Sequence, residues 1–294
     1  MITRLERGGD LAPALDALLA PHVGRAYTLG ITGAPGAGKS TLVGALLSAA
    51  LKRDQRTAVL ALDPVSPLTQ GAILGDRLRM ENAAADDRVF VRSMTADAHG
   101  GGLSVVTPLA IRALDAAGWP WIVVETVGVG QSELDIVEAA ATTVVVLNPG
   151  WGDEVQSVKA GLMEVADVFV INKCDRDGAA ETRRDLERLI AQARPASWQP
   201  RIIDTIANQG VGVDQLWDAV DAHRRHQETS GSLKLRRQRF LLLAMKGLAQ
   251  QAINARLIQY SETGNCAALL DELASGRESV HSAAAKMLAD VQKS

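Results

Sequence analysis

The sequence predicts an α/β fold of three layers, in which helices cover both faces of a mostly parallel central sheet. Short β-branched runs alternate with stretches of helical periodicity along most of the chain, as expected of strand and helix units around a parallel sheet. The runs 122–124 and 144–147 are apolar without alternation, which is typical of strands covered on both faces. With 294 residues, of which 47% are hydrophobic, the chain can form one large domain with appended helices.

The predicted elements follow in order. Apolar residues at helical spacing predict an amphipathic helix from Leu11 to Leu19, with Asp10 as N-cap and Pro21 behind its end. Strands are predicted near 27–32, 57–63, 88–92, 120–126, 142–147, 167–172 and 201–205. An apolar stripe from Leu241 to Ala255 predicts a long helix, and further helices are expected near 265–274 and 279–292.

Three segments are expected: an N-terminal helical segment (1–26), a nucleotide-binding domain (27–222) and a C-terminal helical arm (223–294). The boundary is placed at 223–239, where six Lys or Arg residues stand against one Glu and Ser230-Gly231-Ser232 interrupts the pattern. A role in nucleic-acid binding is the weaker interpretation of this basic stretch, because such runs are usually solvated. The helical arm is expected to serve packing or dimerisation.

Composition excludes several classes of protein. A net charge of −3 gives no general attraction to nucleic acid or anionic membrane. Only Cys174 and Cys266 are present and no signal-like start is seen, so we expect a reduced, cytoplasmic protein. No apolar run approaches the ~20 residues of a membrane helix, so no membrane partner is expected.

One motif predicts nucleotide binding. Gly33-Ala34-Pro35-Gly36-Ala37-Gly38-Lys39-Ser40 fits G-x-x-x-x-G-K-[ST], between an apolar strand and a helical pattern. The glycines let backbone N–H groups turn inward at the positive end of the following helix, which suits a phosphate. Lys39 is expected on the outer phosphates and Ser40 on Mg²⁺. The predicted nucleotide site includes this run and Thr41.

A second motif, Asn172-Lys173-Cys174-Asp175, ends a predicted strand and favours guanine. Asp175 can accept from N1–H and the N2 amine of guanine together, whereas adenine would leave this carboxylate unpaired at a cost. Asn172 can contact the O6 and N7 side, and the Lys173 stem can lie over the ring. The segment Thr205-Ile206-Ala207 could bring a backbone N–H to the guanine oxygen. The expected ligands are therefore GTP or GDP with Mg²⁺.

Carboxylates near other strand ends are candidates for the metal and the attacking water. Glu125 ends a hydrophobic strand and is followed by Gly128, whose N–H can sense the γ-phosphate. Asp63 and Asp76 are further metal candidates, although either could be a turn or cap residue. Val129 stands where many small GTPases have glutamine, and Gln131 is shifted. We therefore expect slow intrinsic hydrolysis that a partner accelerates.

Together these residues resemble the MeaB/ArgK family of P-loop GTPases, the methylmalonic aciduria type A-like chaperones of adenosylcobalamin-dependent acyl-CoA mutases. The segments that carry the resemblance are 33–41, 63–64, 73–80, 125–133, 149–156, 159–164 and 172–175. Ile206 departs from it, since serine is more typical there.

The resemblance implies a P-loop GTPase fold with a helical dimerisation arm and groups Asp63, Asp76 and Glu125 around the metal. The segment with Asp153, Glu154 and Lys159, together with Gln131, would signal nucleotide state to the mutase. The resemblance implies that the protein gates adenosylcobalamin loading and protects or reactivates methylmalonyl-CoA mutase or a related mutase. The implied protein is a homodimer. A nickel-insertion GTPase and a P-loop kinase of small molecules are the alternatives.

Overall fold

A computed structural model describes residues 1–7, 11–63, 85–95, 106–126, 140–150, 165–192 and 197–293. The chain separates into two compact units, Met1–Leu241 and Leu242–Ser294. None of the helices in these ranges is both long and apolar enough to cross a membrane.

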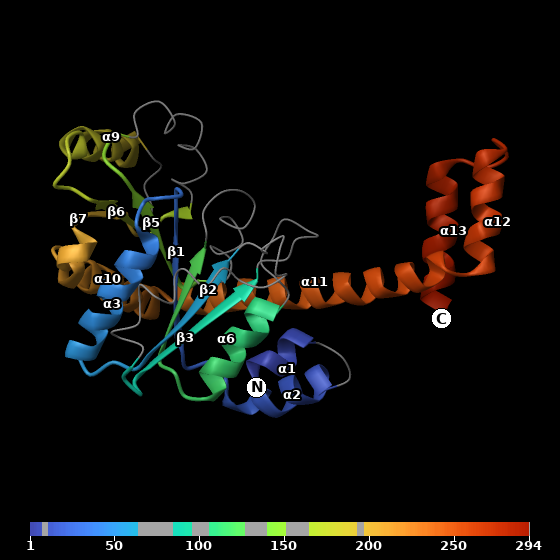
Figure 1. Cartoon of the computed structure of the whole chain (residues 1–294), viewed down its shortest axis with the longest axis horizontal. Coiled ribbons are helices and arrows are strands. Elements are labelled where there is room, and N and C mark those ends of the chain that lie inside the picture. Colours follow the sequence, from blue (N-terminus) through green and yellow to red (C-terminus); the bar gives the residue numbers. More distant parts are fainter. Residues whose placement is uncertain are drawn as a thin grey trace. The chain divides into compact units, whose positions relative to one another are not determined.

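A parallel sheet forms the centre of the first unit (Figure 1). Its strands are β1 (Tyr27–Gly33), β2 (Thr57–Asp63), β3 (Val89–Thr95), β4 (Trp121–Thr126), β5 (Thr142–Leu147), β6 (Val168–Asn172) and β7 (Arg201–Thr205). They lie in the order β3-β2-β4-β1-β5-β6-β7, and every described pairing is parallel. The predicted strands are confirmed, and the mostly parallel sheet is parallel throughout its described part.

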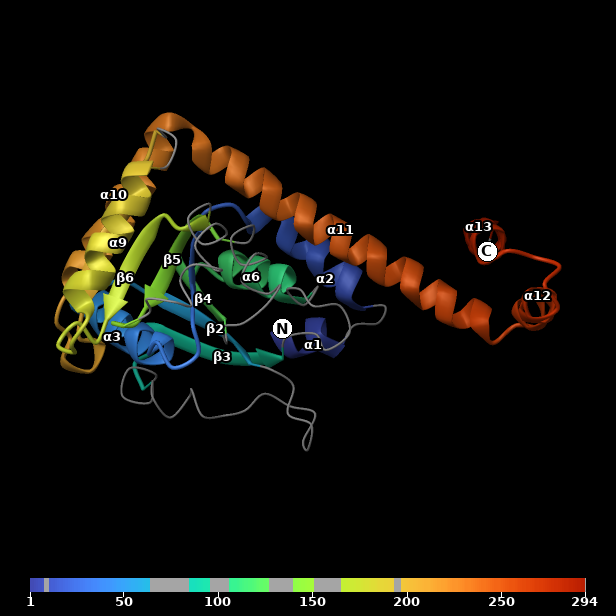
Figure 2. The same ribbon diagram turned by 90° about the horizontal axis from the view of Figure 1, so that it is seen from above.

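Helices cover both faces of this sheet, as a turned view also shows (Figure 2). One face carries α3 (Lys39–Lys52) and α10 (Val213–Ser230), and the other carries α6 (Val106–Ala116) and α9 (Ala179–Gln192). Alternate residues of β5 point to opposite sides: Val144 and Val146 join the core under α3 and α10, whereas Val145 and Leu147 join the core under α9. Burial on both faces explains why this strand reads as a continuous apolar run.

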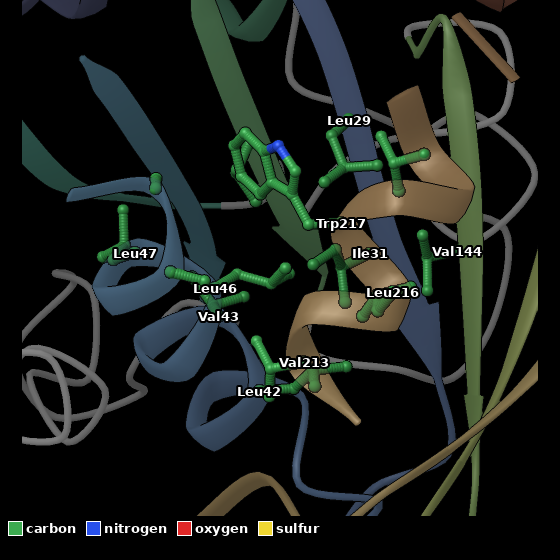
Figure 3. Close-up of a cluster of buried hydrophobic side chains, with 14 of the residues drawn as sticks. Leu29, Ile31, Leu42, Val43, Leu46, Leu47, Val144, Val213, Leu216 and Trp217 are labelled. Atoms are coloured by element: carbon green, nitrogen blue, oxygen red, sulfur yellow. The ribbon is translucent and has the colours of Figure 1, made fainter. Parts of the chain in front are cut away.

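The core under α3 and α10 holds both flanks of the phosphate loop (Figure 3). Leu42 and Leu46 of α3 and Leu216 of α10 pack with Ile31 of β1, and all four are at most 2% exposed. Each such side chain stabilises the fold by about 1.5–3 kcal/mol. The loop between β1 and α3 is therefore attached to two rigid elements.

The N-terminal segment contains two helices, whereas the sequence predicted one. Helix α2 (Leu11–Leu19) is present as expected, and α1 (Ile2–Arg7) precedes it. Ile2 and Leu5 are buried against α6. Two apolar residues in so short a segment give no periodicity from which α1 could have been recognised.

A buried polar cluster joins α10 and the start of α11 (Ser232–Ser261) to the sheet. The Asp167 carboxylate accepts two hydrogen bonds of 2.6 Å from Arg236 and one of 2.8 Å from the backbone N–H of Thr143. His223 lies 3.4 Å from Asp167, and burial lowers the pKa of His223 to about 4. This cluster lies at the amino ends of β5 and β6, away from the edge where the strands end.

The second unit consists of the rest of α11, α12 (Gly264–Ala274) and α13 (Val280–Lys293). Tyr260, Cys266 and Val291 form its small core. The Thr263 side chain caps α12 by accepting from the backbone N–H of Cys266 at 3.4 Å. The helices expected near 265–274 and 279–292 are confirmed.

Candidate functional site

The candidate site lies where the parallel strands end. Loops that follow the carboxyl ends of parallel strands meet at one edge of a sheet, and ligands bind there. Strand order places β2 and β4 on one side of β1, and β5, β6 and β7 on its other side. The two motifs, which follow β1 and β6, are therefore separated only by the end of β5.

The phosphate loop requires glycine at its two ends. Gly33 ends β1 with φ +137°, and a Cβ there would lie 2.1 Å from the carbonyl oxygen of Val146. Gly38 precedes α3 with φ +88°, and a Cβ there would lie 2.5 Å from the side-chain nitrogen of Asn172. Close approach of neighbouring backbone and a left-handed conformation both exclude larger residues. The loop thus reaches the N-terminus of α3 in a conformation that suits an anion.

Two side chains at the start of α3 point into the loop and toward β4. The Lys39 ammonium, on a residue only 6% exposed, donates to the carbonyl oxygens of Gly33 and Ala34 at 2.8 and 3.0 Å. The Ser40 hydroxyl donates to Glu125 at 2.6 Å, and Glu125 is 3% exposed. The structure therefore brings together the lysine, hydroxyl and carboxylate that the sequence predicted.

Strand register explains why Glu125 reaches this position. Glu125 of β4 pairs with Ile31 of β1 on one side and Ala61 of β2 on the other. Asp63 follows two residues after Ala61 at the end of β2, so its backbone lies at the same edge. The hydroxyl of Ser40 and the carboxylate of Glu125 are hard oxygen ligands, the type that Mg²⁺ prefers. The residues present therefore fit that ion.

Asn172 joins the two motifs. Its side-chain nitrogen donates to the carbonyl oxygen of Ala37 at 2.8 Å. Its side-chain oxygen accepts from the Thr205 hydroxyl and from the N–H of Ala207, both at 3.1 Å. Because both ends of the amide are engaged within the protein, Asn172 fixes the phosphate loop to the segment after β7.

The residues after Asn172 turn back over the phosphate loop. Lys173 has a left-handed backbone (φ +58°), which is uncommon for a residue with a side chain and occurs often at functional sites. Its ammonium donates to the carbonyl oxygen of Gly36 at 2.7 Å. A backbone hydrogen bond of 3.0 Å from Arg176 to Lys173 closes the turn, and it leaves Asp175 exposed. The Asp175 carboxylate is therefore accessible.

The segment after β7 is held mainly by contacts within the protein. Thr205 is fully buried, and the N–H of Ile206 donates to Val211 at 3.0 Å. The N–H of Ala207, at the start of the short 3-10 helix η2 (Ala207–Gln209), is bound to Asn172. In this arrangement both N–H groups are engaged by protein oxygens.

Several predicted site residues lie outside the described part of the chain. They are Asp76, Gly128, Gln131, Asp153, Glu154 and Lys159, together with the side chain of Asp63. Their placement stays a prediction.

The turn after β5 also belongs to this edge, although no nucleotide role was predicted for it. Asn148 follows β5 directly, and a Cβ added to Gly178 would lie 3.0 Å from the backbone nitrogen of Gly150. The turn 148–150 is therefore packed against the loop that carries Asp175. A polar residue directly after an apolar strand was the available signal.

Comparison with known proteins agrees with this geometry. Residues 4–262 match the model of the family described as methylmalonyl Co-A mutase-associated GTPase MeaB. A putative GTPase of Pyrococcus abyssi is 46% identical over 243 residues, which are 81% of this chain and 75% of the relative. The mitochondrial methylmalonic aciduria type A homolog of Mus musculus is 33% identical, over 77% of this chain and 56% of that protein.

A solved structure extends the likeness to the whole fold. The crystal structure of an LAO/AO transport system kinase superposes with a TM-score of 0.70 at 26% identity, covering 99% of this chain and 91% of that one. The phosphate loop, the parallel sheet and the family match lead to one conclusion. The chain belongs to the family of methylmalonyl-CoA mutase-associated GTPases of the MeaB type and is itself a P-loop GTPase.

Proposed function

We propose that this GTPase couples GTP binding and hydrolysis to the maintenance of an adenosylcobalamin-dependent acyl-CoA mutase. In this function it gates cofactor loading and protects or reactivates methylmalonyl-CoA mutase or a related mutase. The observation that carries the proposal is the family match over residues 4–262, whose description names association with that mutase.

The phosphate half of the site is proposed to act through charge and positioning. Lys39 would exchange the carbonyl oxygens of Gly33 and Ala34, 2.8 and 3.0 Å away, for phosphate oxygens. Ser40 and Glu125, with Asp63 and Asp76, would hold Mg²⁺, which when bound neutralises charge on the phosphate oxygens. Gly128 would contribute its N–H to the γ-phosphate.

The base half is proposed to select guanine mainly through Asp175. Asn172 is engaged at both ends by the protein, so in this arrangement it shapes the pocket while the exposed Asp175 carboxylate is accessible to the base. Lys173 would lie along the ring. Thr205, Ile206 and Ala207 would form the wall behind it.

Slow hydrolysis that a partner accelerates is part of the proposal. The segments with Gln131, Asp153, Glu154 and Lys159 would change with nucleotide state and carry that change to the mutase. Release of the γ-phosphate would then convert one binding state of the complex into another.

A homodimer formed through the helical arm is also proposed. Met245, Leu248, Ala252 and Ala255, spaced by three and four residues, share one face of α11, and all four are exposed. Apolar side chains that recur along one helix favour a partner helix over water. Sedimentation across a concentration series would test the dimer.

The decisive experiment is a binding assay against purified mutases of the acyl-CoA class, with GDP and with a non-hydrolysable GTP analogue. We expect one mutase to bind with a nucleotide-dependent affinity and to raise the GTPase rate. Absence of binding to every such mutase in every nucleotide state would reject the partner, while guanine nucleotide binding would remain. Product analysis is needed as well, because the solved relative is described as a kinase. Free phosphate is expected, and a phosphorylated small molecule would contradict hydrolysis.

A further inference from the structure

A buried acceptor without a donor lies at the nucleotide edge. Among the described residues no group donates to the side-chain oxygen of Asn148, although water does not reach this atom. A buried polar atom without a partner costs about 1–3 kcal/mol. Such an atom at a binding edge indicates an interaction that forms when the site is complete.

Register places Asn148 beside the guanine motif. Leu147 of β5 pairs with Ile171 of β6, so the next residues along the two strands are Asn148 and Asn172. Val144 and Val146 point to the face that carries α3, as do Val168 and Val170. Strand alternation carries Asn148 and Asn172 to that same face, which is the face of the phosphate loop.

The turn that carries Asn148 packs against the segment 173–178, which follows β6. A Cβ on Gly178 would meet the nitrogen of Gly150 at 3.0 Å and its Cα at 3.3 Å. Gly178 itself has φ +89°. The backbones at Gly150 and Gly178 therefore lie in close contact, which holds the turn 148–150 against the segment that follows β6.

Lys173 supplies the matching donor. An ammonium carries three N–H donors, and its described hydrogen bond goes to the carbonyl oxygen of Gly36. The Lys173 stem crosses the phosphate loop, since a Cβ on Gly38 would lie 3.8 Å from its Cε. The Lys173 ammonium therefore has further N–H donors available, close to Asn172, the residue beside Asn148.

We infer that Asn148 is a positioning residue of the nucleotide site, whose side-chain oxygen accepts a hydrogen bond from the Lys173 ammonium when guanine nucleotide is bound. The lysine would then be held between the phosphate loop and β5, with its stem flat against the base. This inference rests on the proposed assignment of the 172–175 motif to guanine.

A double-mutant cycle tests it. The variants are Asn148→Leu, which removes the acceptor and keeps the branched shape, Asn148→Asp, which keeps an acceptor oxygen, and Lys173→Met, which keeps the stem without the charge. Asn254→Leu, on an exposed position of α11, is the matched control. The readout is the dissociation rate of a fluorescent GDP analogue, with the unfolding midpoint of the nucleotide-free protein as a check on folding.

The loss of a hydrogen bond to a charged group corresponds to a change of at least about tenfold in nucleotide binding. We expect Asn148→Leu to release GDP at least about tenfold faster, Asn148→Asp to stay near the wild-type rate, and Asn148→Leu to add little in the Lys173→Met background. A wild-type rate in Asn148→Leu, or the same loss in both backgrounds, overturns the inference. Failure of the unmodified protein to bind GDP would instead reject the guanine assignment itself, so the two failures are distinguishable.

Discussion

The Ser40 hydroxyl donates a 2.6 Å hydrogen bond to the Glu125 carboxylate, and both residues are buried at the end of the phosphate loop. The charged form of a buried carboxylate is stabilised by a hydrogen-bond donor or by a cation. Under the proposed assignment, Ser40 and Glu125 would hold Mg²⁺, which when bound would stabilise the same buried charge.

Removing the Ser40 hydroxyl or the charge of Glu125 should therefore act through the metal. We expect Ser40→Ala and Glu125→Gln each to lower GTP hydrolysis by about two orders of magnitude, because the ion stabilises transition-state charge by several kcal/mol. Titration of Mg²⁺ against phosphate release measures this loss. Ser48→Ala, at an exposed position of the same helix, should keep the wild-type rate, and an unchanged Mg²⁺ dependence in Ser40→Ala would contradict the assignment.

Asp175 should set the choice of base. Asp175→Asn exchanges an acceptor for a group that can also donate, which suits the C2 carbonyl of xanthine and not the N2 amine of guanine. An unpaired polar group costs about 1–3 kcal/mol, so we expect GTP to bind about tenfold to a hundredfold more weakly and XTP to gain. Competition between the two nucleotides measures the change. Asp177→Asn, two residues further and also exposed, should leave the preference for GTP intact.

Alanine substitutions at Gly36 and Gly38 separate the cost of backbone strain from the cost of a steric clash. Both have positive φ, but a Cβ on Gly36 meets nothing within 4 Å, whereas one on Gly38 lies 2.5 Å from the Asn172 side chain. Alanine at position 36 should cost about 1 kcal/mol of unfolding free energy through its backbone conformation alone. Alanine at position 38 should cost more, because it also displaces the Asn172 amide. Urea unfolding of the nucleotide-free variants compares them, and equal losses would show that Asn172 yields freely.

His223 should make stability depend on pH. Burial lowers its pKa from 6.5 to about 4, so the folded state holds the neutral ring while the unfolded state takes up a proton. Its contribution is complete above pH 6.5 and is lost as the pH falls toward 4. The expected loss between pH 7 and pH 5 is about 2 kcal/mol.

Unfolding in urea at the two pH values measures this effect. His223→Gln should have a smaller difference between the two pH values than the wild-type protein, whereas His226→Gln, at a partly exposed position, should not. An identical pH dependence in wild type and His223→Gln would show that other groups cause it.

The local sequence was sufficient to predict the strands, but it could not predict which residues of different strands meet. The run 142–147 was recognisable because every residue of it is buried. The hydrogen bonds of Asn172 to Ala37 and Thr205 were not, since these residues meet only when β1, β6 and β7 lie in one sheet. The same holds for Asp167 and Arg236, whose 2.6 Å pair joins distant parts of the chain. Motif spacing identifies chemistry, and strand order decides which groups meet.

The order of the strands also sets the length of ligand that can span this edge of the sheet. From β2, which ends at Asp63, to β6, which ends at Asn172, the sheet takes four steps, and at about 4.8 Å for each step they span about 19 Å. Under the proposed assignments one half of this edge engages phosphates and the other half engages the base. Guanosine alone or pyrophosphate alone would occupy half of it and bind weakly. A nucleotide joins the two halves covalently, so its second contact is intramolecular and benefits from a high effective concentration.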